Sequence, residues 1–108
     1  MKRGDVVLVA PPGDFGKPRP AVVIQTDLIN DTHASVLLCL ITSHLADTPL
    51  LRLTVSPTPG NGLLKTSQIQ ADKLYTARRE KIGPVVGRMD EATMGNLGRA
   101  LAFVMELG

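Results

Sequence analysis

Residues 2–9, KRGDVVLV, and residues 17–25, KPRPAVVIQ, decide the fold of this chain. Residues 6–10 and 21–26 are short apolar runs rich in β-branched side chains, and each run predicts a strand. The prolines and glycines between them indicate a shaped and partly rigid loop. No helix-length segment separates these early strands, so we expect an antiparallel arrangement rather than parallel β-α-β units.

More strands are predicted further along the chain. Residues 35–42 are apolar on both faces, which is typical of a central strand. Residues 50–55 alternate between apolar and polar side chains, which favours a half-exposed strand. Residues 63–71 and 82–89 are the remaining predicted strands. We expect the polar residues 27–34 to form a connection, and the charged residues 72–81 a connection with a short helical turn.

The apolar pattern changes to a helical period of about 3.6 residues after Asp90. Asp90 is a good N-cap, and Glu91 suits the positive end of a helix dipole. An apolar stripe follows at helical spacing, formed by Met94, Leu97, Leu101 and Val104. Gly95 and Gly98 suggest close packing against a strand or against a second copy of the helix. The pattern as a whole predicts a mainly β fold, a small antiparallel β-barrel or sheet with a C-terminal α-helix.

The composition fits one globular domain that covers residues 1–108. Apolar residues make up 44% and charged residues 20% of the chain, which is an ordinary globular profile. The net charge of +2 does not by itself argue for nucleic-acid binding. Two cationic segments would form a basic surface if they met in space, Lys17 with Arg19, and Lys73 with Arg78, Arg79 and Lys81. On charge alone, two separate solvated loops are the simpler interpretation.

Cysteine usage and the N-terminus favour a cytoplasmic protein. Cys39 is the only cysteine, so an internal disulfide is impossible and a reducing compartment is expected. Its apolar neighbours in the sequence favour a small buried side chain over a nucleophile. The N-terminus lacks a signal-peptide pattern, and no stretch approaches the ~20 apolar residues of a membrane span.

The inventory of reactive side chains is small. His33 and His44 are the only histidines, and their spacing with Cys39 matches no zinc motif. The sequence also lacks a phosphate-binding glycine loop and a Gly-x-Ser-x-Gly elbow. An enzyme with this sequence would therefore work without a metal, a nucleotide cofactor or a Ser-His-Asp triad.

RNA cleavage suits such an inventory because RNA carries its own nucleophile, the 2′-hydroxyl. The enzyme has to align that oxygen with phosphorus, stabilise charge on the phosphoryl oxygens and manage two protons. Arg19 lies between Pro18 and Pro20 in a stiffened loop, and Thr42 ends the central strand. Taken alone, an ordinary surface arginine explains the position of Arg19 equally well, and an ordinary strand-end threonine is the simpler explanation for Thr42.

Four blocks of sequence, in order, resemble the MazF/PemK family of type II toxins. The Arg-Gly-Asp start at residues 3–5 leads through an apolar strand and a loop to Arg19-Pro20 and the second strand. Residues 40–43, LITS, resemble the end of the family's third strand. Residues 62–69, GLLKTSQI, and residues 81–83, KIG, resemble the later blocks. The resemblance covers essentially the whole chain. Each block is common on its own, but the four blocks in this order are specific for the family.

The resemblance implies a compact SH3-like β-barrel with a C-terminal helix, assembled as a homodimer. It implies a toxin that cleaves single-stranded RNA at short sequences without metal or cofactor, leaving a 2′,3′-cyclic phosphate and a 5′-hydroxyl. A partly disordered cognate antitoxin is the implied protein partner. Two alternatives share the fold, a gyrase-poisoning toxin of the CcdB type and an inactive binding module.

The same resemblance implies roles for individual residues. Arg19 matches the catalytic arginine of the family and is expected to stabilise phosphate charge, since a guanidinium is an awkward general base. Thr42 matches the catalytic threonine and is expected to hydrogen-bond a phosphoryl oxygen. The expected substrate-binding residues are Lys17, Ser43, Lys65, Ser67 and Asp72.

Two departures from the family pattern bear on this site. The loop at residues 10–18 is several residues shorter than usual, and in the family it covers the RNA groove and contributes to sequence choice. Some relatives use an Arg-x-Asp pair on the fifth strand for acid–base work. Gln70 stands at the arginine position and Asp72 at the aspartate position, so the pair is broken. Asp72 is expected to orient Arg19 or to accept a proton.

Overall fold

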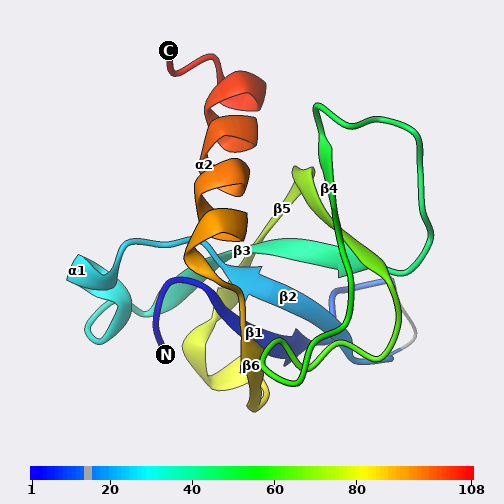
Figure 1. The fold of residues 1–108 in the computed structure, drawn as a ribbon. Helices are drawn as coiled ribbons and strands as arrows, with labels where there is room; N and C mark the ends of the chain where they lie inside the picture. Colours follow the sequence, from blue (N-terminus) through cyan, green and yellow to red (C-terminus); the bar gives the residue numbers. More distant parts are fainter. Residues whose placement is uncertain (14–15) are drawn as a thin grey trace.

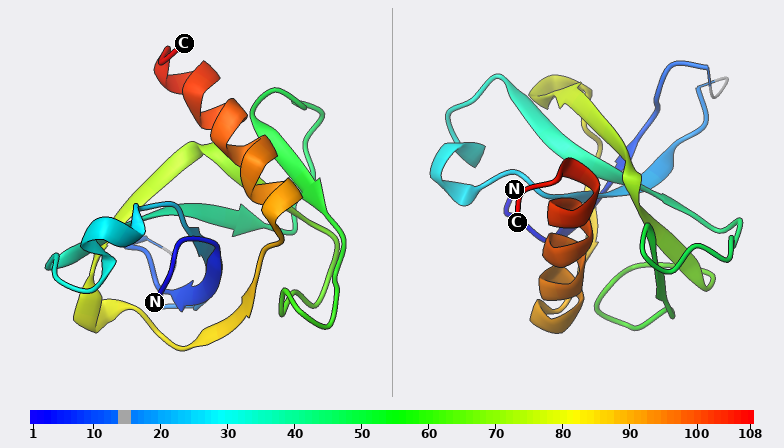
Figure 2. Two further views of the ribbon diagram at one scale, coloured as in Figure 1. Left: turned by 60° about the vertical axis from the view of Figure 1, so that its left-hand side comes forward. Right: turned by 90° about the horizontal axis from the view of Figure 1, so that it is seen from above.

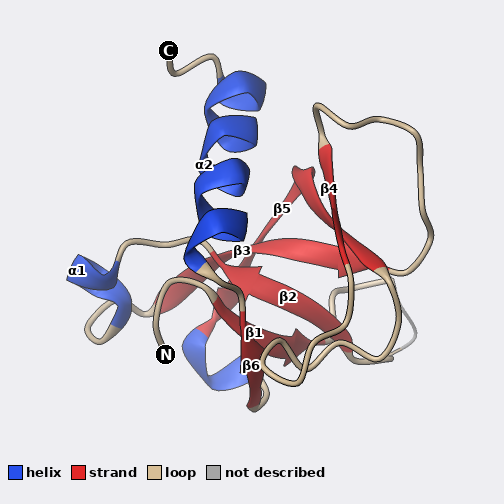
Figure 3. Ribbon diagram, viewed as in Figure 1, coloured by secondary structure: helices blue, strands red, loops and turns tan. Residues whose placement is uncertain are grey.

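The computed structural model describes residues 1–13 and 16–108, and in these residues six strands form one antiparallel sheet (Figures 1 and 3). The order across the sheet is β4-β5-β3-β2-β1-β6. The elements are β1 (Asp5–Val9), β2 (Arg19–Val23), α1 (Asp27–Asn30), β3 (Ser35–Thr42), β4 (Arg52–Val55), β5 (Ser67–Arg78), the 3-10 turn η1 (Arg79–Lys81), β6 (Val85–Arg88) and α2 (Glu91–Met105). The predicted mainly β class with a C-terminal helix is confirmed.

The sheet curls on itself, as the two views in Figure 2 show. Apolar side chains on both of its faces are buried. Successive strand residues point to opposite faces, so Val6 and Val7 enter different clusters. The cluster around Val6 also contains Leu97 and Leu101 of α2. The helix therefore covers one face of the curled sheet.

The central strand β3 has the predicted bounds and pairs with β2 on one side and β5 on the other. Cys39 in this strand is fully buried, as predicted. Burial disfavours the thiolate and raises the pKa of the Cys39 thiol to about 12. The side chain therefore acts as core filler rather than as a nucleophile.

The first two strands are shifted from their predicted bounds. Val9 pairs with Arg19, so β2 begins at Arg19 and ends at Val23, and the predicted loop position of Arg19 is wrong. The predicted connection at residues 27–34 contains the short helix α1, whose first turn is capped by the side chain of Thr26.

The charged segment at residues 72–81 differs most from its prediction. Residues 72–78 continue β5, and only Arg79–Lys81 forms a turn. Arg78 pairs with Ser35 at the start of β3, whereas Lys17 and Arg19 lie near its end. Seven residue steps along a strand correspond to about 23 Å. The register therefore places Arg78 at the far end of β3 from Arg19, whereas Lys73 follows nearer to it, since its neighbour Leu74 pairs with Cys39 in the middle of β3.

Helix α2 begins as predicted and buries only part of its stripe. The Asp90 carboxylate accepts a hydrogen bond from the backbone N–H of Thr93 at 2.7 Å, which lowers the pKa of Asp90. Leu97 and Leu101 are buried, whereas Val104 at the end of the stripe is 38% exposed. A Cβ added at Gly95 or Gly98 would have no neighbour closer than 3.9 Å, so neither glycine packs closely here. In the described residues, no helix has the length and apolarity to cross a membrane.

Candidate functional site

One cavity gathers most of the residues that the sequence singled out. It has a volume of about 800 Å³ and lies where β2 begins, β3 ends and the chain approaches β5. Its predicted site residues are Lys17, Arg19, Thr42, Ser43, Lys65 and Ser67. Apolar side chains complete the lining, among them Leu8, Leu63, Leu64 and Val86.

Strand register brings these residues together. Ala21 pairs with Leu40, and because the strands are antiparallel, Arg19 at the start of β2 lies beside Thr42 at the end of β3. On the other side, Thr42 pairs with Gln68, the second residue of β5. The segment just before β5, which carries Lys65, therefore forms the opposite wall.

A glycine allows this wall of the cavity to lie close to β6. Gly62 has a φ of +71°, and a Cβ at this position would lie 2.3 Å from the carbonyl oxygen of Val86 in β6. Only glycine adopts this conformation without strain and allows this contact. The hydroxyl of Ser67 then donates to the carbonyl oxygen of Lys65 at 2.8 Å. Ser67 is buried, so its contribution is to hold the Lys65 loop in place.

The charged side chains that line the cavity are cations. Lys17, Arg19 and Lys65 line it, and no aspartate or glutamate is among its lining residues in the part of the chain that the structure describes. Arg19 is half-buried and the two lysines are exposed. A concave site lined by cations concentrates anions, and a guanidinium matches the oxygens of a phosphate.

Thr42 is held by its own strand end. The backbone N–H of His44 donates a hydrogen bond to the Thr42 hydroxyl oxygen at 3.1 Å. A hydroxyl that accepts in this way still has its proton to donate. Thr42 is half-buried in the cavity wall, so its proton can be presented to an anionic oxygen of a bound molecule.

Asp72 does not line this cavity, contrary to its predicted role. Its carboxylate binds Arg52 of the edge strand β4 through two hydrogen bonds, of 2.9 Å and 3.3 Å. The Arg52 side chain holds the pKa of Asp72 below its ordinary value. Gln70, at the position of the family's arginine, is buried and pairs with Arg52 across the two strands.

His44 lines the cavity and was missed as a site residue from the sequence. The histidines were weighed there only as zinc ligands. The signal that would have found His44 is its position two residues after Thr42, on the same strand end. Among the described residues, no group of three or more His, Cys, Asp or Glu side chains could hold a metal ion.

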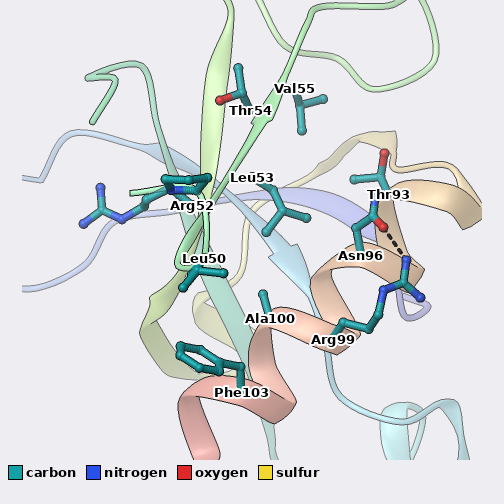
Figure 4. A pocket seen from close by; sticks show the side chains of 11 residues that line it. Leu50, Arg52, Leu53, Thr54, Val55, Thr93, Asn96, Arg99, Ala100 and Phe103 are labelled. Carbon is teal, nitrogen blue, oxygen red and sulfur yellow. Dashed lines mark hydrogen bonds between the residues drawn. The ribbon is translucent and has the colours of Figure 1, made fainter. Parts of the chain in front are cut away.

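A second cavity, of about 520 Å³, lies between β4 and α2 (Figure 4). Leu50 and Leu53 line it from the β4 side, and Ala100 and Phe103 from α2. Leu50 and Phe103 are largely exposed, so this cavity offers apolar surface, and Arg52 and Arg99 also line it. None of the predicted site residues lines it.

Comparison with known proteins gives a consistent result. A family model described as "PemK-like, MazF-like toxin of type II toxin-antitoxin system" matches residues 2–105. A curated protein of Mycolicibacterium smegmatis (strain ATCC 700084 / mc(2)155), named "Probable endoribonuclease MazF", is 41% identical over 102 residues, which cover 94% of this chain and 93% of that protein.

Solved structures share the fold. A mycobacterial endoribonuclease in complex with its cognate antitoxin superposes with a TM-score of 0.82 at 24% identity, covering 100% of this chain and 97% of the other. The Mycobacterium tuberculosis toxin MazF-mt6 superposes with a TM-score of 0.83 at 16% identity, covering 96% and 98%. At these identities the structures support the fold alone.

Proposed function

This chain belongs to the PemK-like, MazF-like toxins of type II toxin–antitoxin systems, and on that premise we propose that it is an endoribonuclease that cleaves single-stranded RNA at short sequences. The 2′-oxygen attacks the adjacent phosphorus, and the bond to the 5′-oxygen breaks. The products are a 2′,3′-cyclic phosphate and a 5′-hydroxyl. The reaction needs no metal or cofactor because the substrate supplies the nucleophile.

The observation that carries this proposal is the meeting of Arg19 and Thr42 in one cationic cavity. The Arg19 guanidinium stabilises the charge that grows on the phosphoryl oxygens, and the Thr42 hydroxyl donates to one of them. Lys17 and Lys65 bind the phosphates on either side of the scissile bond. Ser43, exposed at the rim, contributes a further hydrogen bond to the RNA.

A cleavage assay on RNA tests the proposal. A long single-stranded transcript is incubated with the purified protein in excess EDTA, and the cut ends are sequenced. We expect defined cuts with 5′-hydroxyl ends, which a polynucleotide kinase labels without prior phosphatase treatment. Arg19→Ala and Thr42→Ala should each lower the rate by about 100-fold or more and relieve growth arrest.

The matched control is Arg78→Ala, which removes an exposed arginine at the opposite end of β3. It should cut at the wild-type rate. Unchanged thermal unfolding of the Arg19 and Thr42 variants excludes a folding defect. Intact RNA together with stalled gyrase would contradict the proposal and favour the gyrase-poisoning alternative. If the protein neither cuts RNA nor stalls gyrase, the inactive binding module is the remaining alternative.

The proposal extends to partners and location. We expect a cognate antitoxin to neutralise the toxin by covering the cavity, and the toxin to form a homodimer in the cytoplasm, where messenger RNA is translated. The exposed apolar side chains at the end of α2, Phe103, Val104, Met105 and Leu107, support a protein partner on this side of the molecule.

A further inference from the structure

We propose that His44 is the general base of RNA cleavage in the cavity that holds Arg19 and Thr42. This inference rests on the proposed function and adds to it the group that accepts the proton of the 2′-hydroxyl.

The other polar groups of the cavity are poor bases. The side chains of Lys17, Arg19 and Lys65 offer hydrogen-bond donors and no acceptor. The hydroxyls of Thr42 and Ser43 ionise far above neutral pH. Histidine is the side chain that ordinarily changes between charged and neutral forms at about pH 5 to 8. In the described part of the lining, His44 is therefore the one side chain suited to accept a proton.

The position of His44 fits this task. Its backbone N–H is hydrogen-bonded to the Thr42 hydroxyl oxygen at 3.1 Å, so the backbone of His44 is held beside the residue proposed to contact the phosphate, and His44 lines the same cavity. The side chain is exposed, which leaves it accessible to a nucleotide in the cavity. The 2′-hydroxyl that must lose its proton lies next to the scissile phosphate in the substrate. The general base is therefore needed beside the residue that donates a hydrogen bond to that phosphate.

The remaining acid–base groups are placed elsewhere. Asp72, the expected proton acceptor, is occupied by Arg52 on β4. Asp47, three residues beyond His44 in the same loop, does not line the cavity. His33 precedes β3, at the far end of that strand from His44, and its carbonyl oxygen accepts hydrogen bonds from Arg79.

The step balances without any further reagent. The neutral imidazole of His44 takes the proton as the 2′-oxygen bonds to phosphorus, and the bond from phosphorus to the 5′-oxygen breaks. The 5′-oxygen takes a proton from water, and the imidazolium returns its proton to the hydroxide that this leaves. The cations that line the cavity together with His44, namely Lys17, Arg19 and Lys65, stabilise the added negative charge on phosphorus.

The test is the pH dependence of single-turnover cleavage of a short RNA that spans a mapped cut site. For the wild-type protein we expect the rate to rise through about pH 5 to 8 and then level off. His44→Gln should be slower by about 100-fold or more, with a rate that keeps rising with pH because hydroxide replaces the base. Added imidazole should partly restore the rate of His44→Ala.

His33→Gln is the matched control, because it removes the other histidine of the chain at a distance from the cavity, and it should keep the wild-type profile. Binding of an uncleavable 2′-O-methyl RNA should be equal for wild type and His44→Gln. If His44→Gln keeps the wild-type rate and profile while Arg19→Ala is inactive, the inference fails and the proposed function stands. If the wild type itself cuts no RNA, the proposed function fails first.

A substrate with sulfur in place of the bridging 5′-oxygen separates the two possible proton transfers, because a thiolate leaves without being protonated. We expect the defect of His44→Gln to persist with this substrate. Restoration of the wild-type rate would show that His44 protonates the leaving oxygen and would overturn the assignment as base.

Discussion

At the scale of single residues, the ion pair between Arg52 and Asp72 makes a prediction about stability. Asp72→Asn should lower the free energy of unfolding at pH 7 by about 1 kcal/mol or less, because both side chains are partly exposed. The folded-state pKa of Asp72 lies below its ordinary value of 3.8. The pair therefore stabilises the protein above pH ~4 and loses its effect as the pH falls through the lowered pKa.

Urea unfolding of both proteins between pH 7 and pH 3 measures this effect. The difference in unfolding free energy should be constant above about pH 5 and shrink toward zero below about pH 4. A difference that grows on acidification would contradict the pairing. RNA cleavage at pH 7 should be unchanged by Asp72→Asn, because Asp72 does not line the cavity.

The sequence predicted the site residues to different extents, for physical reasons. Arg19 and Thr42 could be proposed because each lies in a short, recognisable block, and strand register then brings the two together. The contact of Asp72 with Arg52 could not be predicted because Arg52 is 20 residues away in the sequence, and only pairing of β4 with β5 makes them neighbours. His44 was overlooked because a lone histidine carries no motif.

At the scale of elements, Gly62 makes a prediction about the wall of the cavity. Gly62→Ala should lower the free energy of unfolding by roughly 2 to 4 kcal/mol, because it combines a left-handed φ with a clash against the Val86 carbonyl. The control is Gly60→Ala, whose added Cβ would meet no atom closer than 3.9 Å and which should cost less than about 1 kcal/mol. Chemical unfolding measures both, and equal losses would contradict this account.

Two element predictions with different outcomes show what the local pattern reveals: β3 was located correctly, and the second half of β5 was not. The strand β3 was located correctly because an apolar run with both faces buried has few alternatives. The second half of β5 was read as a charged connection because Asp72 and Lys73 face solvent. Its backbone nevertheless pairs with β3 from Leu74 to Arg78, and that pairing is invisible in the local pattern.

At the scale of the whole molecule, the exposed end of α2 makes a prediction about assembly. Phe103 is 61% and Leu107 70% exposed, and Phe103 also lines the cavity against β4. If this surface joins two copies, replacing both residues by Ser should weaken self-association by about tenfold or more. Sedimentation measures this change. The control is Leu28→Ser, which makes the same kind of apolar-to-polar change at an exposed position on α1 instead of α2, and it should leave assembly unchanged. A strictly monomeric wild type would refute the homodimer.

The closure of the sheet also bears on when this toxin becomes active during its own synthesis. Asp5 in β1 pairs with Arg88 in β6, 83 residues later, and Val86 of β6 forms part of the cavity wall. At about 5 to 20 residues per second, a ribosome needs about 4 to 17 seconds to make that stretch. Throughout this interval β1 lacks its outer partner and the cavity is incomplete. The nascent chain therefore gains a complete cavity only after β6 has been made.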